Sequence, residues 1–374
     1  MPSLPLPVYF LNSLKTHWGY KLGFTLIVYV ALVRYKRYQR INALLQKYPD
    51  PTIPLHNREA AQEVLCCFGH YDFPYLYAVS MEYALLMTYG IPSISRILAG
   101  TREFARQCLK RTDDTVLFLH EMAEPYPRKV YREMKNNGQL DEVEDRNDTI
   151  RESIATERVN FIHGHYPIKH DDFLYTIGLL VLEPARWIDQ FEWRQITELE
   201  KNALLAVWIY HGERMNIQNI PRSYKKLEEW TNNYGAKHMV YAESNVGVAE
   251  ATIDLFITLV PRFLNPIARQ ITVALLGDRL RGAYGIAPPP RGLKSFAVAL
   301  LKLRALFIKY FMLPRRYPLI RTALRANADN KYVPRWNKYG SVYPHGYKIE
   351  DLGPRRFQGK CPVLMKGTMN SSDH

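Results

Sequence analysis

The sequence is poor in cysteine, and its few cysteines are badly placed for cross-links or metal binding. Only Cys66, Cys67, Cys108 and Cys361 occur in 374 residues, and no two of them form a Cys-x-x-Cys pair. Neither a disulfide framework nor a structural zinc site is therefore indicated. A reducing compartment fits this use of cysteine best.

Signals for β-structure and for nucleotide binding are also absent. The sequence contains no strand-length run in which apolar and polar residues alternate, and no glycine-rich phosphate loop. Apolar residues instead recur at spacings of three and four, as in Leu76, Val79, Tyr83 and Leu86, which is typical of a helix that faces a core. We therefore expect an all-α protein whose main helical domain spans residues 48–290.

The charge balance is strongly basic. Lys and Arg total 50 against 36 Asp and Glu, which gives a net charge of +14 and a pI near 9.4. Such a charge attracts either nucleic acid or an anionic membrane surface. No zinc-finger spacing, aromatic RNA-binding stretch or basic zipper is present, so we expect membrane lipid and not nucleic acid as the partner.

Long apolar runs are scarce, and the most apolar one lies near the N-terminus. The uncharged run 22–33 has only twelve residues, fewer than the roughly 20 that cross a bilayer upright. With Trp18, Tyr20 and Tyr35 as interfacial anchors, we expect a short membrane-anchor helix over about residues 18–35, within an N-terminal segment 1–47. A buried amphipathic helix is the alternative.

The residues around this run also predict an orientation. Basic residues after the run outnumber those before it, which by the positive-inside rule places the rest of the chain in the cytosol. A span this short suits the thin membrane of the endoplasmic reticulum. We therefore expect a single-pass protein of that membrane with its main domain in the cytosol.

The last segment, residues 291–374, differs in character from the main domain. It begins with a helix that mixes a wide apolar face with several Lys and Arg residues, and it ends in an irregular stretch rich in Tyr, Pro, Arg and Gly. Such a helix can lie in the headgroup plane of a membrane. An ordinary domain helix with a solvated basic face is the alternative.

The segment 157–188 gathers the most candidate ligands. His163 and His165 are two residues apart, so on a helix they point in nearly opposite directions and cannot hold one ion. His170 follows a proline and has no fixed relation to either. The Asp pair at 171–172 fits better as the N-cap of the helix that follows. A single histidine can still hold haem iron, because the porphyrin supplies four nitrogens, although a lone histidine on an apolar helix is more often a core residue.

Three further residues could carry chemistry. Glu82 is a carboxylate within an apolar helix, where burial would raise its pKa toward the range of a general base; an exposed glutamate at the helix edge is the alternative. Arg96 and Thr101 lie five residues apart on the next helix, roughly 140° around it, so they could line one wide pocket. A surface arginine and a packing threonine would explain the same pattern.

Three stretches carry a family resemblance: YALLMTYGIPSISRILAGT, RVNFIHGHY and DDFLYTIGLLVLEPARWIDQFEWR. They resemble the fungal endoplasmic-reticulum-bound oxygenase family typified by mpaB, which is more distantly similar to the bacterial latex-clearing proteins. The resemblance covers about residues 63–286. It implies an all-α, globin-like fold with b-type haem, and dioxygen-dependent cleavage of an isoprenoid double bond to carbonyl products.

The resemblance also implies roles for individual residues. His163 would be the proximal ligand of the haem iron, with Arg158 beside it as a propionate or structural partner. Glu82 would assist the oxygen chemistry, and Arg96 and Thr101 would belong to the distal pocket.

The function expected on these grounds is that of a membrane-anchored haem oxygenase. Its substrate would be a lipophilic prenylated small molecule, its co-substrate dioxygen, and a redox partner could supply electrons. Two alternatives remain open at this point. One is a non-catalytic haem or lipid carrier at the membrane surface, and the other is a non-haem metal hydrolase that uses His163, His165 and the Asp pair.

Overall fold

The protein is helical throughout its described part. The computed structural model describes residues 6–360, with side chains from residue 18 onward. Within this range it contains fourteen α-helices and no strand, apart from one isolated bridge between Tyr332 and Tyr347. The expected all-α class is therefore confirmed. The helices are α1 (Leu6–Lys47), α2 (Arg58–Leu65), α3 (Pro74–Thr88), α4 (Pro92–Thr101), α5 (Glu103–Ala123), α6 (Pro125–Lys135), α7 (Glu142–His163), α8 (His170–Phe191), α9 (Glu198–Arg214), α10 (Tyr224–His238), α11 (Glu243–Ile257), α12 (Asn265–Leu275), α13 (Asp278–Tyr284) and α14 (Leu293–Phe311).

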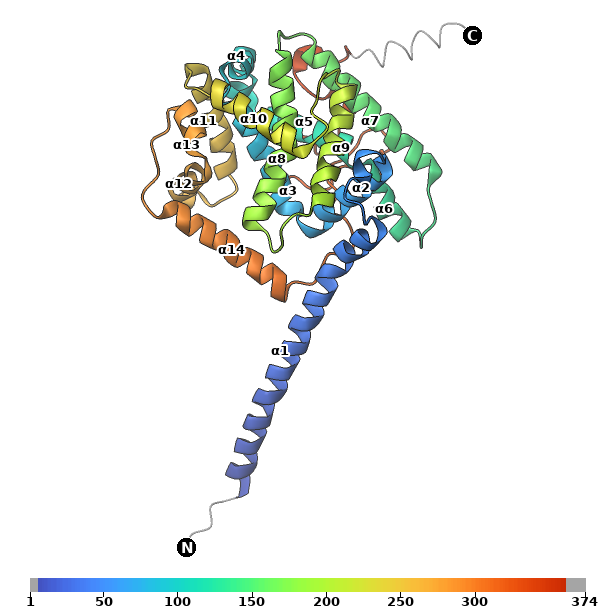
Figure 1. The fold of residues 1–374 in the computed structure, drawn as a ribbon, viewed down its shortest axis with the longest axis vertical. Helices are drawn as coiled ribbons and strands as arrows, with labels where there is room; N and C mark the ends of the chain where they lie inside the picture. Colours follow the sequence, from blue (N-terminus) through green and yellow to red (C-terminus); the bar gives the residue numbers. More distant parts are fainter. Residues whose placement is uncertain (1–5, 361–374) are drawn as a thin grey trace.

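Helix α1 projects from one end of a body that the other helices form (Figure 1). Its exposed residues include Trp18, Tyr20 and Phe24, each at least 70% exposed, whereas Val33 and Ile41 near its base are buried. No helix among residues 6–360 is long and apolar enough to cross a membrane. The predicted helix is thus present, but the prediction of a membrane span over residues 18–35 is not supported, because charged residues limit the apolar run to residues 22–33.

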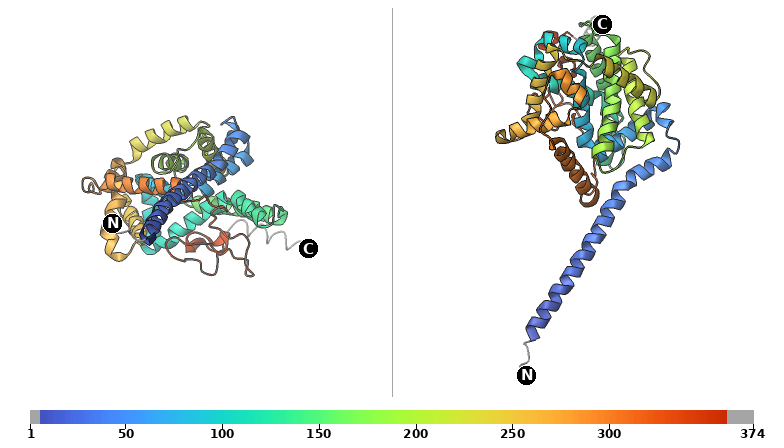
Figure 2. Two further views of the ribbon diagram at one scale, coloured as in Figure 1. Left: turned by 90° about the horizontal axis from the view of Figure 1, so that it is seen from below. Right: turned by 60° about the vertical axis from the view of Figure 1, so that its left-hand side comes forward.

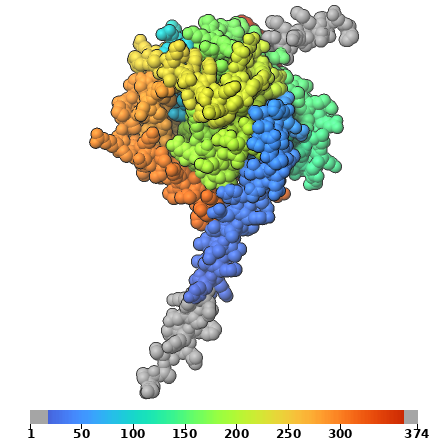
Figure 3. Space-filling model, viewed as in Figure 1, coloured from blue at the N-terminus to red at the C-terminus, as the bar shows by residue number. Residues whose placement is uncertain are grey.

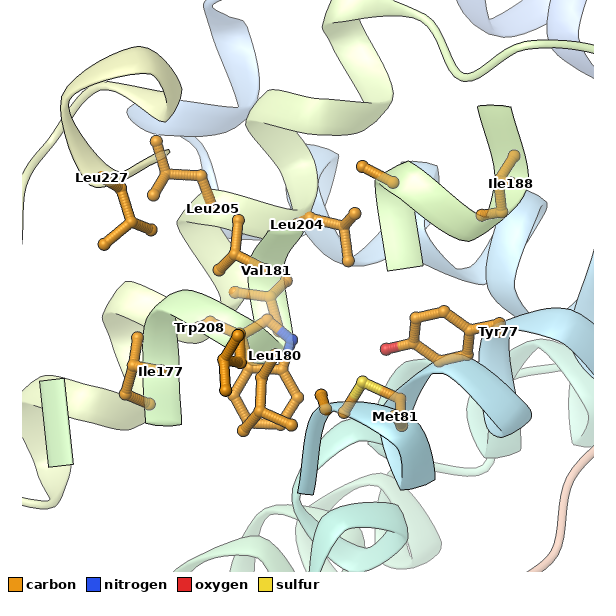
Figure 4. Close-up of a cluster of buried hydrophobic side chains, with 14 of the residues drawn as sticks. Tyr77, Met81, Ile177, Leu180, Val181, Ile188, Leu204, Leu205, Trp208 and Leu227 are labelled. Atoms are coloured by element: carbon orange, nitrogen blue, oxygen red, sulfur yellow. The ribbon is translucent and has the colours of Figure 1, made fainter. Parts of the chain in front are cut away.

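The main core lies where α3, α8 and α9 meet. Figure 4 shows Tyr77 and Met81 of α3 facing Leu180 of α8 and Trp208 of α9. Helix α8 is apolar on almost every side, which is typical of a helix buried at the centre of a bundle. Helix α8 runs through the middle of the body. Residues in its N-terminal half line the cavity described below, whereas residues near its C-terminal end face other surroundings.

The segment after α14, residues 312–360, crosses back over the body, and we call it the C-terminal strap (Figure 2). It contains two short helical turns, Ile349–Asp351 and Arg355–Phe357, and no longer regular element. Four of its side chains complete a second core against α5 and α7, namely Tyr347, Ile349, Leu352 and Phe357. The irregular stretch that the sequence predicted thus packs against the body in its described part.

A buried network of charges holds α5, α6 and α7 together. Glu121 accepts hydrogen bonds from Arg128 at 3.1 Å and from Arg151 at 2.7 Å, and all three side chains are almost fully buried. Asp148 of α7 completes the network by accepting from Arg128 at 2.5 Å. Part of the charged stretch around residues 136–148 forms the first turns of α7 from Glu142 onward. Within it Asp148 is buried and paired, whereas Glu142 and Arg146 form an exposed ion pair.

Candidate functional site

A cavity of about 230 Å³ lies among α3, α4, α5, α7, α8 and α9. Most of its lining is apolar, as Leu85, Ile97, Phe118 and Phe173 illustrate. A few polar groups interrupt this lining, and they come mainly from α5 and from the end of α7. An apolar cavity with a few convergent polar groups is the usual form of a small-molecule or cofactor site.

His163, the last residue of α7, is one of these polar groups. Its ring packs against that of Phe173 with centroids 5.3 Å apart. Its Nδ1 atom is buried and has no hydrogen-bond partner among the described residues. Burial, with the nearby Arg111 guanidinium as a second cause, lowers the pKa of His163 to about 4. The imidazole is therefore neutral near pH 7, which is the form that binds metal.

Helix α5 supplies the charged part of the lining. Arg111, Asp114 and Thr115 all face the cavity, and a guanidinium nitrogen of Arg111 donates to the hydroxyl oxygen of Thr115. The carboxylate of Asp114 is buried and accepts from Lys110 Nζ at 2.6 Å. Burial raises the pKa of Asp114 above its ordinary value, although Lys110 opposes this effect. The cavity thus holds a cation and a carboxyl group whose affinity for a proton is increased.

The C-terminal strap closes one side of the cavity through Gly353 and Pro354. The backbone N–H of Gly353 donates to Asp114 at 3.2 Å, and its carbonyl accepts from Lys110 at 2.9 Å. Gly353 has a φ of +99°, and a Cβ atom there would lie 2.6 Å from Cδ1 of Ile162. The positive φ favours glycine at this position, and any larger residue would also have to displace the end of the Ile162 side chain.

The two predicted distal residues are separated by the structure. Thr101, at the end of α4, lines the cavity, and its hydroxyl donates to the carbonyl of Leu98 at 2.7 Å. Arg96 is exposed and lines none of the described cavities. The cation that faces His163 is Arg111, one helix further along the chain.

Glu82 lies outside the cavity of His163, in a smaller neighbouring cavity of about 60 Å³. Its carboxylate accepts from Lys338 Nζ at 2.5 Å and from the hydroxyl of Tyr339 at 2.7 Å, both in the C-terminal strap. Its side chain is 10% exposed, so the alternative of an exposed glutamate at the helix edge does not hold. The two cavities share the lining residues Leu85, Leu119 and Trp208, so these side chains stand between Glu82 and the cavity of His163.

The smaller cavity also contains buried polar atoms that have no hydrogen-bond partner among the described residues. They include Nε2 of His70, Oδ2 of Asp113 and Nε of Arg321. Buried polar atoms of this kind are uncommon in proteins. They lie beside Glu82 in a cavity whose lining is otherwise largely apolar.

Arg158 is fully buried but does not line the cavity of His163. Its Nε donates to the carbonyl oxygen of Leu352 at 3.0 Å, and one terminal nitrogen lies 3.4 Å from the carbonyl oxygen of Lys360. The geometry therefore matches the structural part of its expected role, which is to hold the C-terminal strap against α7.

Of the remaining candidate ligands of segment 157–188, Asp172 lines the cavity of His163, whereas His165, His170 and Asp171 do not. His165 is exposed, and its Nδ1 lies 2.7 Å from the carbonyl oxygen of Phe161. Asp172 is not the N-cap of α8, which is Lys169; it is buried and accepts from Ser93 and Tyr234. No group of three or more His, Cys, Asp or Glu side chains within residues 18–360 could hold a metal ion.

The residues that sequence reasoning missed are Arg111 and Asp114. Both lie within α5, which runs from Glu103 to Ala123 with a kink at Gln107. Arg111 is three and four residues before Asp114 and Thr115, and these precede Phe118 by four and three residues, so the four side chains share one broad face. Reading that stripe across the kink would have identified them as lining residues.

Comparison with known proteins identifies the family of the chain. Residues 70–305 match the family described as ER-bound oxygenase mpaB/B'/Rubber oxygenase, catalytic domain. A Penicillium brevicompactum protein named ER-bound oxygenase mpaB' is 27% identical, over 92% of this chain and 90% of its own length. A Penicillium roqueforti protein named ER-bound oxygenase mpaB is 26% identical, over 73% of this chain and 91% of its own length. The chain therefore belongs to the mpaB and rubber oxygenase family.

Proposed function

We propose that this oxygenase works with a b-type haem held by His163 in the cavity between α5, α7 and α8. The observation that carries the proposal is a neutral histidine whose buried Nδ1 has no partner among the described residues, in an apolar cavity beside the Arg111 cation. One axial histidine is sufficient for haem, as in the globin arrangement, whereas the absence of any three-ligand cluster among residues 18–360 gives a non-haem metal hydrolase no support.

The residues around His163 fit such a group. The apolar side chains Ile97, Phe118 and Phe173 would contact the faces of a flat macrocycle. Arg111 is placed to pair with a propionate or another anion in the cavity, which is the partner that a guanidinium prefers. Arg158, which the sequence also suggested for this pairing, would instead act at a distance by fixing the end of α7 on which His163 stands.

When bound, the haem would supply the activation of dioxygen, and the protein residues would orient the reactants. The apolar lining would exclude water and hold a prenyl chain. Asp114, whose pKa is raised by burial, could hold a proton within the cavity. Thr101 would contribute a hydroxyl at the end of α4. Glu82 could serve as a base only for a substrate that reaches past Leu85 and Trp208 into the smaller cavity.

The substrate class that suits this cavity is a lipophilic prenylated small molecule. The family description includes rubber oxygenases, and the apolar lining of the cavity accepts a hydrocarbon chain more readily than a polar one. The proposed reaction is cleavage of an isoprenoid double bond by dioxygen, in which the C=C bond and the O–O bond break and each carbon receives one oxygen atom as a carbonyl. This reaction consumes no external electrons, so a reductant or a redox partner would serve only to bring the haem iron to the ferrous state.

The proposed site of action is the cytosolic face of the endoplasmic reticulum membrane. The fungal relatives are named ER-bound, and the exposed aromatic and aliphatic residues of α1 suit contact with lipid. Basic residues at the base of α1, including Arg34, Lys36 and Arg40, favour the anionic cytosolic leaflet.

A product assay tests the activity. The purified protein is loaded with haem and incubated with a farnesylated aromatic compound, a reductant and dioxygen, and the products are analysed by mass spectrometry. Carbonyl products that disappear in His163→Ala and persist in His165→Ala are expected. A protein that binds haem and the substrate but forms no product would support the alternative of a non-catalytic carrier.

A further inference from the structure

Helix α14 has two apolar faces, and only one of them is covered by the protein. The inward face packs on α3 and α8, where Val298 and Leu301 contact the cluster of Leu76, Trp187 and Phe191. Ala297 and Ala305 of the same face are buried. The lateral contact is completed by Arg304, which donates to Glu192 at 3.0 Å. This face accounts for the attachment of α14 to the body.

The outward face of α14 is apolar as well, and it is exposed. Phe296, Leu300, Leu303, Phe307 and Phe311 recur at spacings of three and four, so they form one stripe along the helix. Each is at least 43% exposed, and Leu303 is 64% exposed. Exposure of this face to water is unfavourable, because burial of each large apolar side chain would lower the free energy.

The apolar surface extends beyond α14 onto the corner that leads into α12. Phe263, in the short helix Arg262–Leu264, is 80% exposed, and Ile267 at the start of α12 is 56% exposed. Helices α12 and α14 pack on each other. We call the exposed stripe of α14 together with Phe263 and Ile267 the α14 face.

Side chains of α1 fix this face relative to the projecting helix. Arg37 Nε donates to the carbonyl of Met312 at 2.7 Å, and the hydroxyl of Tyr29 donates to the carbonyl of Phe311 at 2.8 Å. The guanidinium of Arg34 stacks on Tyr310 at 5.3 Å. Figure 3 shows the end of α14 meeting α1 at the lower end of the body. The α14 face and the exposed apolar side chains of α1 therefore lie at the same end of the molecule.

Basic residues lie near the α14 face. Lys294 and Lys302 are exposed on α14, each about 140° around the helix from the centre of the stripe, and Arg315 and Arg316 are exposed just after the helix. Within the described part of the chain, none of these four side chains forms an ion pair. An apolar stripe with Lys on the other side of the helix and Arg at its end is the pattern of a helix that lies in the headgroup layer of an anionic membrane.

We propose that the α14 face is a second, monotopic membrane-docking surface, which lies on anionic phospholipid while α1 provides a separate attachment. The proposal deepens the membrane attachment proposed above and does not depend on haem. Charge complementarity and continuity with α1 favour lipid over a second copy of the chain, since a protein interface is depleted of lysine at its core.

The cavity of His163 lies away from this surface. Helix α8 lines the cavity with residues between Asp172 and Leu180, whereas α14 contacts α8 near Trp187 and Phe191. At about 1.5 Å per residue, the nearer end of the cavity is roughly 10 to 16 Å along α8 from the docking contact. A lipophilic substrate would therefore have to leave the headgroup layer to reach His163.

Site-directed spin labelling of the full-length chain tests the proposal. Single cysteines are introduced by Leu303→Cys and Phe263→Cys, with Val240→Cys, which is also exposed but lies off the face, as the matched control. Cys108→Ser and Cys361→Ser form the background, while Cys66 and Cys67 are buried. Collisions of each label with dioxygen, which enriches in lipid, and with a water-soluble nickel complex are compared before and after addition of phosphatidylcholine vesicles that contain phosphatidylserine.

The expected result is that the labels at 303 and 263 become protected from nickel and accessible to dioxygen, whereas the label at 240 does not change. If the protein binds to vesicles while both labels remain accessible to nickel, the α14 face is not a docking surface. Attachment through α1 would still be possible. If the labels are immobilised without vesicles, and sedimentation shows that the protein forms a dimer under the same conditions, a second copy of the chain covers the face. That result would overturn the proposal.

Substitution gives a second readout. In flotation with the same vesicles, Leu303→Glu with Phe307→Glu should weaken binding by about tenfold or more, since two large apolar contacts are lost. Lys302→Gln should weaken it by about fivefold, and only when phosphatidylserine is present. Ile150→Glu, on an exposed part of α7, is the control and should bind normally. Equal binding by all these variants would also contradict the proposal.

Discussion

The hydroxyl of Tyr339 donates to Oε2 of Glu82 at 2.7 Å, across 257 positions of sequence. Lys338 bonds to the same oxygen, so the C-terminal strap holds both the position and the charge of a carboxylate on α3. The contacts of Glu82 therefore indicate a structural role. Any catalytic role must be separated from this structural one by experiment.

The variant Glu82→Gln makes that separation. It keeps a hydrogen-bond acceptor for Tyr339 but leaves the half-buried Lys338 without an anionic partner, so a loss of about 1 to 2 kcal/mol in the free energy of unfolding is expected. Adding Lys338→Met should restore most of the stability. If carbonyl products still form at the original rate in the stable double variant, Glu82 is not the base.

Glu121 is expected to be far more important for stability than any exposed ion pair. Glu121→Gln would leave Arg128 and Arg151 as buried charges without their shared carboxylate, which should cost about 3 to 5 kcal/mol in chemical denaturation. Glu142→Gln, which removes an exposed partner of Arg146 on α7, is the control and should change stability by less than about 0.5 kcal/mol. Similar losses in the two variants would argue against the buried network.

The close approach of α8 and α10 depends on Gly178. A Cβ atom there would lie 2.1 Å from the hydroxyl oxygen of Thr231 and 3.0 Å from its methyl carbon, so rotation of Thr231 brings no relief. Gly178→Ala should destabilise the protein by about 1 to 3 kcal/mol. Gly282→Ala on α13, where a Cβ meets nothing within 4 Å, should be neutral or stabilising by up to about 1 kcal/mol. Adding Thr231→Ser to Gly178→Ala should not rescue it fully, because the Cβ atom of residue 231 remains close.

The lowered pKa of His163 predicts that the stability of the protein depends on pH. This pKa is about 4 in the folded protein, against about 6.5 unfolded. The unfolded chain therefore binds a proton first as the pH falls, so stability is present above pH 6.5 and is lost between about pH 6.5 and 4. His163→Leu should lower the slope of unfolding free energy against pH by up to about 1.4 kcal/mol per pH unit in this range. An unchanged slope in urea denaturation at several pH values would contradict the neutral, buried state of His163.

Local sequence patterns predicted several of the helices. The three- and four-residue spacing of Leu76, Tyr83 and Leu86 predicted α3, and the apolar stretch after Lys169 predicted α8, because helix periodicity depends only on near neighbours. His163 was identified largely through the family resemblance, since a lone histidine on an apolar helix is more often a core residue, and the structure places it in the largely apolar cavity.

Contacts between distant segments could not be predicted in this way. The pairing of Glu82 with Lys338 and the closure of the cavity by Gly353 join segments hundreds of positions apart, and no local pattern encodes them. Arg96 was expected in the pocket from its spacing to Thr101 and from the family resemblance, and Arg111 was not among the candidates. In the structure Arg96 is exposed, and the stripe of α5 that contains Arg111 faces His163.

The absorption spectrum of the purified full-length protein tests the central claim, which is that His163 holds haem. A Soret band is expected in the wild-type protein, retained in His165→Ala, lost in His163→Ala and partly restored there by added imidazole. Absence of the band after haem loading, or a band that is unchanged in His163→Ala, would contradict haem ligation by this residue.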